Sequence, residues 1–145
     1  MNPALLTTII LSAGLGEQAS PLVLEGRDGP GKGKHVVLLA GDEEYRSEEM
    51  LPQLARILSE RHGFKVTVSF SVNEKGQIEP NAQKKQIGLE ALETADLVVM
   101  MLRFRQWPAA DMKRFVDRYL AGVPIVAIRT STHAFNYPND STDPY

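Results

Sequence analysis

The chain has 145 residues, 43% of them hydrophobic, with 16 Lys+Arg, 18 Asp+Glu and a formal net charge of -2. This length and composition predict one globular domain with an ordinary core, and the charge gives no basic footprint for nucleic acid. There is no cysteine, which excludes a thiol nucleophile, a disulfide framework and a thiolate metal site. We therefore expect a small-molecule or protein partner and no nucleic acid.

An apolar and small-residue stretch, ALLTTIILSAGL, covers residues 4–15. It has the length of a signal-peptide core and is too short to span a bilayer, so we expect a signal peptide over 1–19, a secreted or periplasmic location and no stable membrane span. Against this, no Lys or Arg precedes Arg27, and Glu17 stands close to the expected cleavage point. The alternative is an ordinary N-terminal arm on a cytoplasmic protein.

Residues 20–34 are rich in Gly, Pro and charge, a composition typical of a flexible linker, so the fold is expected to start at His35. The run HVVLLA at 35–40 predicts a strand buried on both faces. A helix over 47–62 follows, with Ser47 as its N-cap and Gly63 as its stop.

The next segments continue the alternation of strands and helices. Residues 64–72 alternate as a strand exposed on one side would, near the sheet edge, and 73–86 form a long polar loop. A short helix at 88–94 leads to the most hydrophobic run, 95–102, which predicts a central strand. A helix from Trp107-Pro108 to about Ala121 and a strand at 124–128 complete the pattern.

This order predicts parallel strands joined by right-handed crossovers, and hence a flavodoxin-like three-layer α/β domain over 35–135. Four strands are few for such a sheet, and the tail 136–145 (NYPNDSTDPY) has no periodic apolar face. We therefore expect a partial domain, truncated at its C-terminus, or a shortened relative of a larger one.

Three apolar runs end in polar clusters: 35–40 in GDEEYR, 95–102 in RFR and 124–128 in RTSTH. The carboxyl ends of parallel strands lie along one edge of a sheet, where ligands bind in open α/β folds. The three clusters are therefore expected to converge on one site.

These segments, from Lys34 to Phe135, include GDEEYRSEEMLP, GLEALETADLVVMMLRFRQWP and GVPIVAIRTSTHAF. As a set they resemble the ThuA-like (trehalose-utilisation) proteins of the class I glutamine amidotransferase-like superfamily. The resemblance implies an amidotransferase-like fold and a role in the metabolism of sugars, including keto-disaccharides. In the amidotransferases a cysteine occupies a strained strand-to-helix turn. Here the equivalent place holds Arg129 and Thr130, so the resemblance implies that glutamine hydrolysis is lost.

His133 and Glu44 are the candidate catalytic residues, because an imidazole and a carboxylate can act as acid and base near neutral pH. Each has a plainer interpretation, His133 as a loop histidine and Glu44 as a solvated acid beside a helix N-terminus. Arg129 could hold a carboxylate, a phosphate or a sugar hydroxyl, or pair with a loop acid.

Several further residues are expected to bind substrate. Arg103 and Arg105 would form an anion clamp, or one of them would pair with the acidic loop after the first strand. The remaining candidates are side chains of the first and third clusters: Tyr45, Arg46, Thr130 and Ser131. The sequence has no metal-ligand spacing and no phosphate loop after a strand, so we expect no cofactor.

Three functions stay open. The first is a ThuA-like enzyme, of hydrolase or isomerase type, acting on a carbohydrate or its keto derivative. The second is a non-catalytic module that binds a sugar or an anion, and the third is an inactive fragment of a larger domain. A homo-oligomer is compatible with each of them.

Overall fold

The computed structural model describes residues 18–142 and 144–145, which form a mixed α/β fold around a mostly parallel six-stranded sheet. The predicted signal peptide over 1–19 lies almost wholly outside the described residues. Within them, none of the helices combines the length and the apolar character needed to cross a membrane.

The sheet has the strand order β1-β3-β2-β5-β6, and β4 pairs with β3 beside β1. Neighbouring strands among β3, β2, β5 and β6 run parallel, whereas β1 and β4 are antiparallel to β3. The strand bounds are β1 Leu22–Leu24, β2 His35–Gly41, β3 Lys65–Ser71, β4 Gln86–Ile87, β5 Leu97–Leu102 and β6 Ile125–Ala127.

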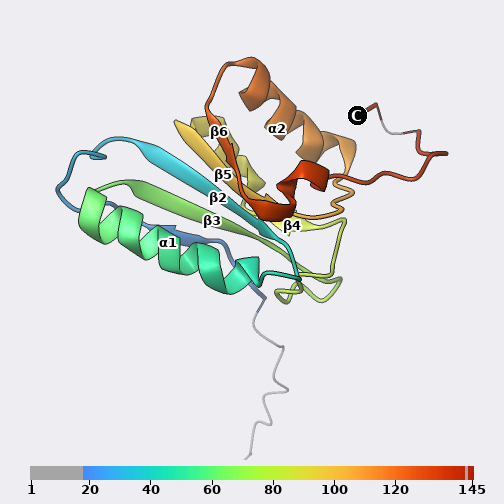
Figure 1. Cartoon of the computed structure of the whole chain (residues 1–145), viewed down its shortest axis with the longest axis horizontal. Helices are drawn as coiled ribbons and strands as arrows, with labels where there is room; N and C mark the ends of the chain where they lie inside the picture. The colour runs from blue at the N-terminus through green and yellow to red at the C-terminus, as the bar shows by residue number, and fades with distance from the viewer. Residues whose placement is uncertain (1–17, 143) are drawn as a thin grey trace, which may run out of the picture.

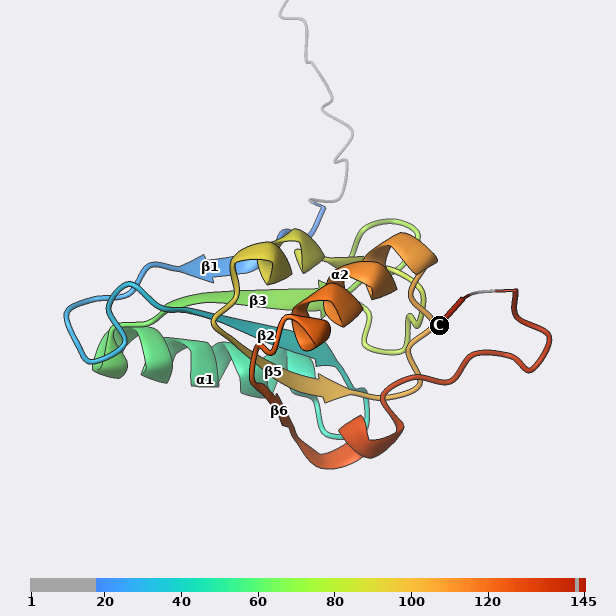
Figure 2. The ribbon, with the colours of Figure 1, turned by 90° about the horizontal axis from the view of Figure 1, so that it is seen from above.

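Helices cover both faces of the sheet (Figures 1 and 2). Helix α1, Ser47–His62, packs on one face, and the 3-10 helix η1, Leu89–Thr94, lies with α2, Ala109–Leu120, on the other. A last 3-10 turn, η2, Arg129–His133, follows β6 directly. The α/β class, the parallel strands and helix 47–62 were predicted from the sequence and are confirmed.

Strand β2 lies between the two hydrophobic cores on the opposite faces of the sheet, and all seven of its residues are buried. Val36 and Leu38 belong to the core beneath α1, while Val37 and Leu39 belong to the core with η1 and Trp107. The alternation follows from the two-residue period of a strand, and a strand covered on both faces reads as a continuous apolar run.

The predicted flexible linker over 20–34 is wrong in part, because β1 lies within it and pairs with β3. Its three residues are too few to show a period in the sequence. Gly26, two residues after β1, allows close packing, because a Cβ at this position would collide with the carbonyl oxygen of Gly63. The strand at 64–72 lies next to the edge strand β1, near the sheet edge as predicted, but its expected exposure on one side is wrong, because β3 is buried along almost its whole length.

The predicted N-cap of α1 is wrong as well. Arg46 holds that position in the left-handed conformation, with a φ of 53°. The Ser47 hydroxyl accepts a hydrogen bond from the Asp42 N–H at 2.8 Å instead, and so closes the loop between β2 and α1.

His35, at the start of β2, joins the sheet to η1. It is 7% exposed, and its ring nitrogens lie 2.9 Å from the hydroxyls of Thr94 and Thr67. Burial, assisted by the nearby Lys65 ammonium, lowers the pKa of His35, with Asp96 opposing the shift. The folded protein therefore favours the neutral imidazole.

We expect this buried histidine to make stability depend on pH. Since its pKa is lower in the folded state, the unfolded chain binds a proton first as the pH falls below the ordinary value of about 6.5. The free energy of unfolding should fall from there until the pH reaches the lowered pKa. Urea denaturation between about pH 8 and about pH 5 should show the stability advantage of the wild type over His35→Gln shrinking toward low pH. The matched control is His62→Gln, at the exposed end of α1; an equal trend there would contradict the assignment.

Candidate functional site

The strand order reverses direction between β2 and β5. From β2 the chain moves to β3 on one side and later to β5 on the other, so the carboxyl ends of β2 and β5 form a topological switch point. The loops after β2 and β5, together with η2 after β6, follow this same edge. In open α/β sheets ligands bind at such a crevice.

Among the described residues, three other than glycine have left-handed backbones, and all three follow strands at this edge. They are Arg46 after β2, Phe104 after β5 and Arg129 after β6, with φ values of 53°, 56° and 53°. Such a conformation costs an L-residue about 1–2 kcal/mol, so surrounding contacts must hold it. One such contact is the hydrogen bond that the Phe104 N–H donates to the His133 carbonyl oxygen at 3.1 Å. Contacts within the chain thus hold the loops of this edge in defined conformations.

Asp42 anchors the first loop and connects it to η2. It is fully buried, and its Oδ1 accepts from the N–H groups of Glu44 and Tyr45 at 2.9 and 3.3 Å. Its other oxygen accepts from the Thr130 hydroxyl. One buried carboxylate therefore fixes Tyr45 and the start of η2 relative to each other.

Glu43 and the arginines after β5 form an ionic cluster beside this anchor. Arg103 pairs with Glu43 and, at 3.4 Å, with Glu44. Arg105 lies 3.7 Å from the second oxygen of Glu43 and is 1% exposed. Both predicted clamp arginines thus pair with the acidic loop, and Phe104 between them has a left-handed backbone, so the three residues are not extended.

Arg105 also holds the long polar loop between β3 and β4, here called the rim loop, in place. Its Nη1 donates to the Ser71 hydroxyl at 2.9 Å and to the carbonyl oxygens of Pro80 and Ala82 at 3.1 and 2.8 Å. Its Nε donates to the Arg103 carbonyl oxygen at 2.7 Å. Burial lowers the pKa of Arg105, and Glu43 and Asp42 counteract the shift. With these partners, the guanidinium is a structural group and not a ligand-facing one.

An open cavity of about 270 Å³ lies at this edge, between the first loop and η2. Four of the predicted site residues line it: Tyr45, Arg129, Thr130 and His133. The Arg129 guanidinium lies 4.2 Å from the centre of the Tyr45 ring, a cation–π contact that orients the charge. His133 stacks beside Phe104, with ring centres 5.1 Å apart, and its Nδ1 lies 3.2 Å from the Thr132 hydroxyl.

The other predicted site residues do not line this cavity. Ser131 donates to the Met100 carbonyl oxygen at 3.0 Å and accepts from the Leu102 N–H at 3.1 Å, so its hydroxyl joins η2 to β5. Glu44 pairs with Arg103, and Arg46 pairs with Glu49 on the exposed start of α1. Trp107, which follows the RFR cluster, is fully buried in the core.

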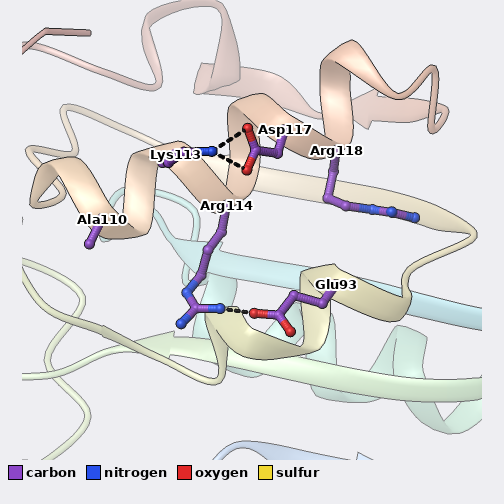
Figure 3. A pocket seen from close by; sticks show the side chains of 6 residues that line it. All are labelled: Glu93, Ala110, Lys113, Arg114, Asp117 and Arg118. Atoms are coloured by element: carbon purple, nitrogen blue, oxygen red, sulfur yellow. Dashed lines mark hydrogen bonds and ion pairs between the residues drawn. The ribbon is translucent and has the colours of Figure 1, made fainter.

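A larger cavity of about 480 Å³ lies elsewhere, between η1 and α2 (Figure 3). Its charged residues are largely joined to one another: Arg114 pairs with Glu93, and Lys113 pairs with Asp117 at 2.7 Å. Arg118 extends away from them, and its Nη2 donates to the Ala95 carbonyl oxygen at 2.6 Å. No group converges on the space, so its size alone does not make it the better candidate.

The candidate site is lined by the side chains of Tyr45, Arg129, Thr130 and His133. Among the described residues, no group of three His, Asp or Glu side chains is placed to hold a metal ion. Comparisons with known proteins do not assign the site, since no family model, no curated protein and no solved structure matches the chain. The cavity offers one fixed cation, an aromatic ring and an imidazole.

The bond from Thr130 to Asp42 should contribute measurably to stability. Thr130→Val keeps the shape of the side chain and removes a donor from a buried carboxylate, which should lower the free energy of unfolding by about 1–3 kcal/mol. Thr132→Val, two residues along and exposed, should change it by less than about 0.5 kcal/mol. Urea denaturation of both variants measures the difference, and equal effects would show that Asp42 does not depend on this hydroxyl.

Proposed function

We propose that this chain is a ThuA-like domain with a flavodoxin-like arrangement, and that its strand-end cavity binds a small carbohydrate or its keto or acid derivative. The support is the parallel sheet with helices on both faces and a polar cavity beside its topological switch point. A secreted or periplasmic setting belongs to the same proposal and rests on the apolar stretch at 4–15.

The observation that carries this proposal is the placement of Arg129 in the cavity. Its guanidinium stacks on Tyr45 without an acidic partner among the described residues, so its donors remain for a ligand. An arginine offers a planar fork that suits a carboxylate or adjacent hydroxyls. The Tyr45 ring adds an apolar surface of the kind that sugar rings pack against.

The turn that carries Arg129 agrees with the resemblance to amidotransferases. Arg129 follows β6 directly, has a φ of 53° and begins the helical turn η2. A strained residue between a strand and a helical turn is the geometry of a nucleophile elbow. With arginine in that place, the proposed function is recognition by charge, with no thiol chemistry.

The geometry favours binding over catalysis as the basic property of the site. His133 faces the cavity, but no described carboxylate bonds to its ring, and Glu44 is held by Arg103. A general acid or base is ordinarily oriented by such a partner. An enzyme using His133 is the second candidate, favoured by the position of that imidazole in the cavity lining.

Arg129→Ala should weaken binding of a sugar acid about 10-fold to 100-fold, because a hydrogen-bonded charge contributes about 1.5–3 kcal/mol. Calorimetric titration of the full chain with galacturonate, gluconate, fructose, glucose and trehalose would test this, with the acids expected to bind most tightly. The matched control is Arg114→Ala, which alters the larger cavity and should leave the affinity unchanged.

The same ligands, tested for binding and for turnover, separate the two candidate functions. Loss of binding in Arg129→Ala, with retention in His133→Gln, supports a binding module. Turnover of a bound keto sugar that disappears in His133→Gln supports the enzyme. Equal losses in Arg129→Ala and Arg114→Ala, or no binding by any member of the panel, would contradict the proposed site.

A further inference from the structure

Strand β6 forms one edge of the sheet and has a described neighbour, β5, on its inner side alone (Figure 2). The Pro124 carbonyl oxygen accepts from the Val98 N–H at 3.0 Å, and the Ile128 N–H donates to the Met100 carbonyl oxygen at 2.9 Å. Alternate residues of a parallel strand face the same neighbour, so Val126 also bonds toward β5.

The backbone groups of Ile125 and Ala127 therefore point away from the sheet. In the described structure, neither residue has a hydrogen-bond partner beyond the ladder to β5. The edge thus presents two N–H groups and two carbonyl groups, two residues apart, as an antiparallel strand requires.

The sequence around this edge lacks the charges that usually protect one. Residues 119–128 (YLAGVPIVAI) contain no Asp, Glu, Lys, Arg or His. Three large apolar side chains in this segment are exposed: Tyr119 at 64%, Leu120 at 74% and Val126 at 47%. An exposed strand edge without charged side chains is a template for pairing with another strand.

We propose that β6 pairs antiparallel with β6 of a second copy of this chain, about a two-fold axis at Val126. In this register Ile125 lies opposite Ala127 of the other copy, and the outward groups of each such pair exchange two hydrogen bonds. The two Val126 residues face each other as a non-hydrogen-bonded pair, in which side chains approach most closely. The two sheets then form one continuous sheet.

Three features favour a second copy over a foreign strand. The outward groups at Ile125 and Ala127 are symmetric about Val126, so the edge is complementary to itself. Because residues 119–128 are uncharged, two copies meet there without like-charge repulsion. The exposed Tyr119 and Leu120 lie in the same segment and would extend the contact.

The opposite edge of the sheet provides the control. Val23 on β1 is 49% exposed, close to the value for Val126, but β1 is followed by Glu25 and Arg27, and Glu25 pairs with Lys65 at 3.2 Å. Charges of this kind discourage pairing at an edge. Val23 and Val126 thus differ in their surroundings and not in their exposure.

The absence of cysteine allows a direct test by cross-linking. In Val126→Cys each chain has a single thiol, placed at the proposed axis. The Cα atoms of such a pair lie about 4.5 Å apart, within the range of about 4.4–6.8 Å that a disulfide tolerates. Mild oxidation of dilute full-length protein should convert Val126→Cys to a covalent dimer, whereas Val23→Cys should stay largely monomeric.

Sedimentation equilibrium of the wild-type chain and its lysine variants tests the same interface without an introduced cysteine. Val126→Lys should raise the dissociation constant of the dimer by about tenfold or more, because two ammonium groups would meet at the axis. Val23→Lys should leave it unchanged. A wild-type chain that stays monomeric at all concentrations, equal effects of the two lysines, or equal cross-linking of the two cysteines would overturn the proposal. If Val126→Lys fails to fold, the cross-linking of Val126→Cys and Val23→Cys still tests the proposal.

Discussion

A buried guanidinium at the carboxyl edge of the sheet is the constraint on which the candidate site depends. Removing an arginine from water is costly unless its donors are satisfied, and Arg105 is 1% exposed. It meets that requirement by drawing together the end of β3 at Ser71, the rim-loop carbonyls of Pro80 and Ala82, and the acidic loop at Glu43. Segments distant in sequence are thereby fixed around one charge.

The distribution of charge in the cavity follows from this arrangement. Arg105 and Arg103 bind the carboxylates of Glu43 and Glu44, while Asp42 is occupied by backbone N–H groups and Thr130. The acids of the first loop are therefore engaged in structure, and the cavity in front of Tyr45 keeps a positive lining. Under the proposed function, this edge would select a ligand by its negative or electron-rich groups.

The sequence predicted those features that depend on local pattern. Strands β2 and β5 and helix α1 were predictable because an unbroken apolar run and a capped amphipathic segment each have a characteristic period. Strands β1 and β4 were not, since two or three residues show no period and neither lies in an apolar run as long as the one around β6 at 123–128. The use of Arg103 and Arg105 as partners of Glu43 was weighed only as an alternative, because ion pairing across 60 residues leaves no local signal. The left-handed backbones of Arg46, Phe104 and Arg129 also left no local signal in the sequence.

The proposed binding site is the cavity between the first loop and η2, and not the larger cavity between η1 and α2. Amide chemical-shift mapping of the ¹⁵N-labelled full chain during a galacturonate titration tests this most directly. If galacturonate binds at the proposed site, the largest shifts should fall within residues 42–46 and 129–133. Shifts concentrated at Glu93 and residues 113–118 would contradict it and assign binding to the cavity of Figure 3.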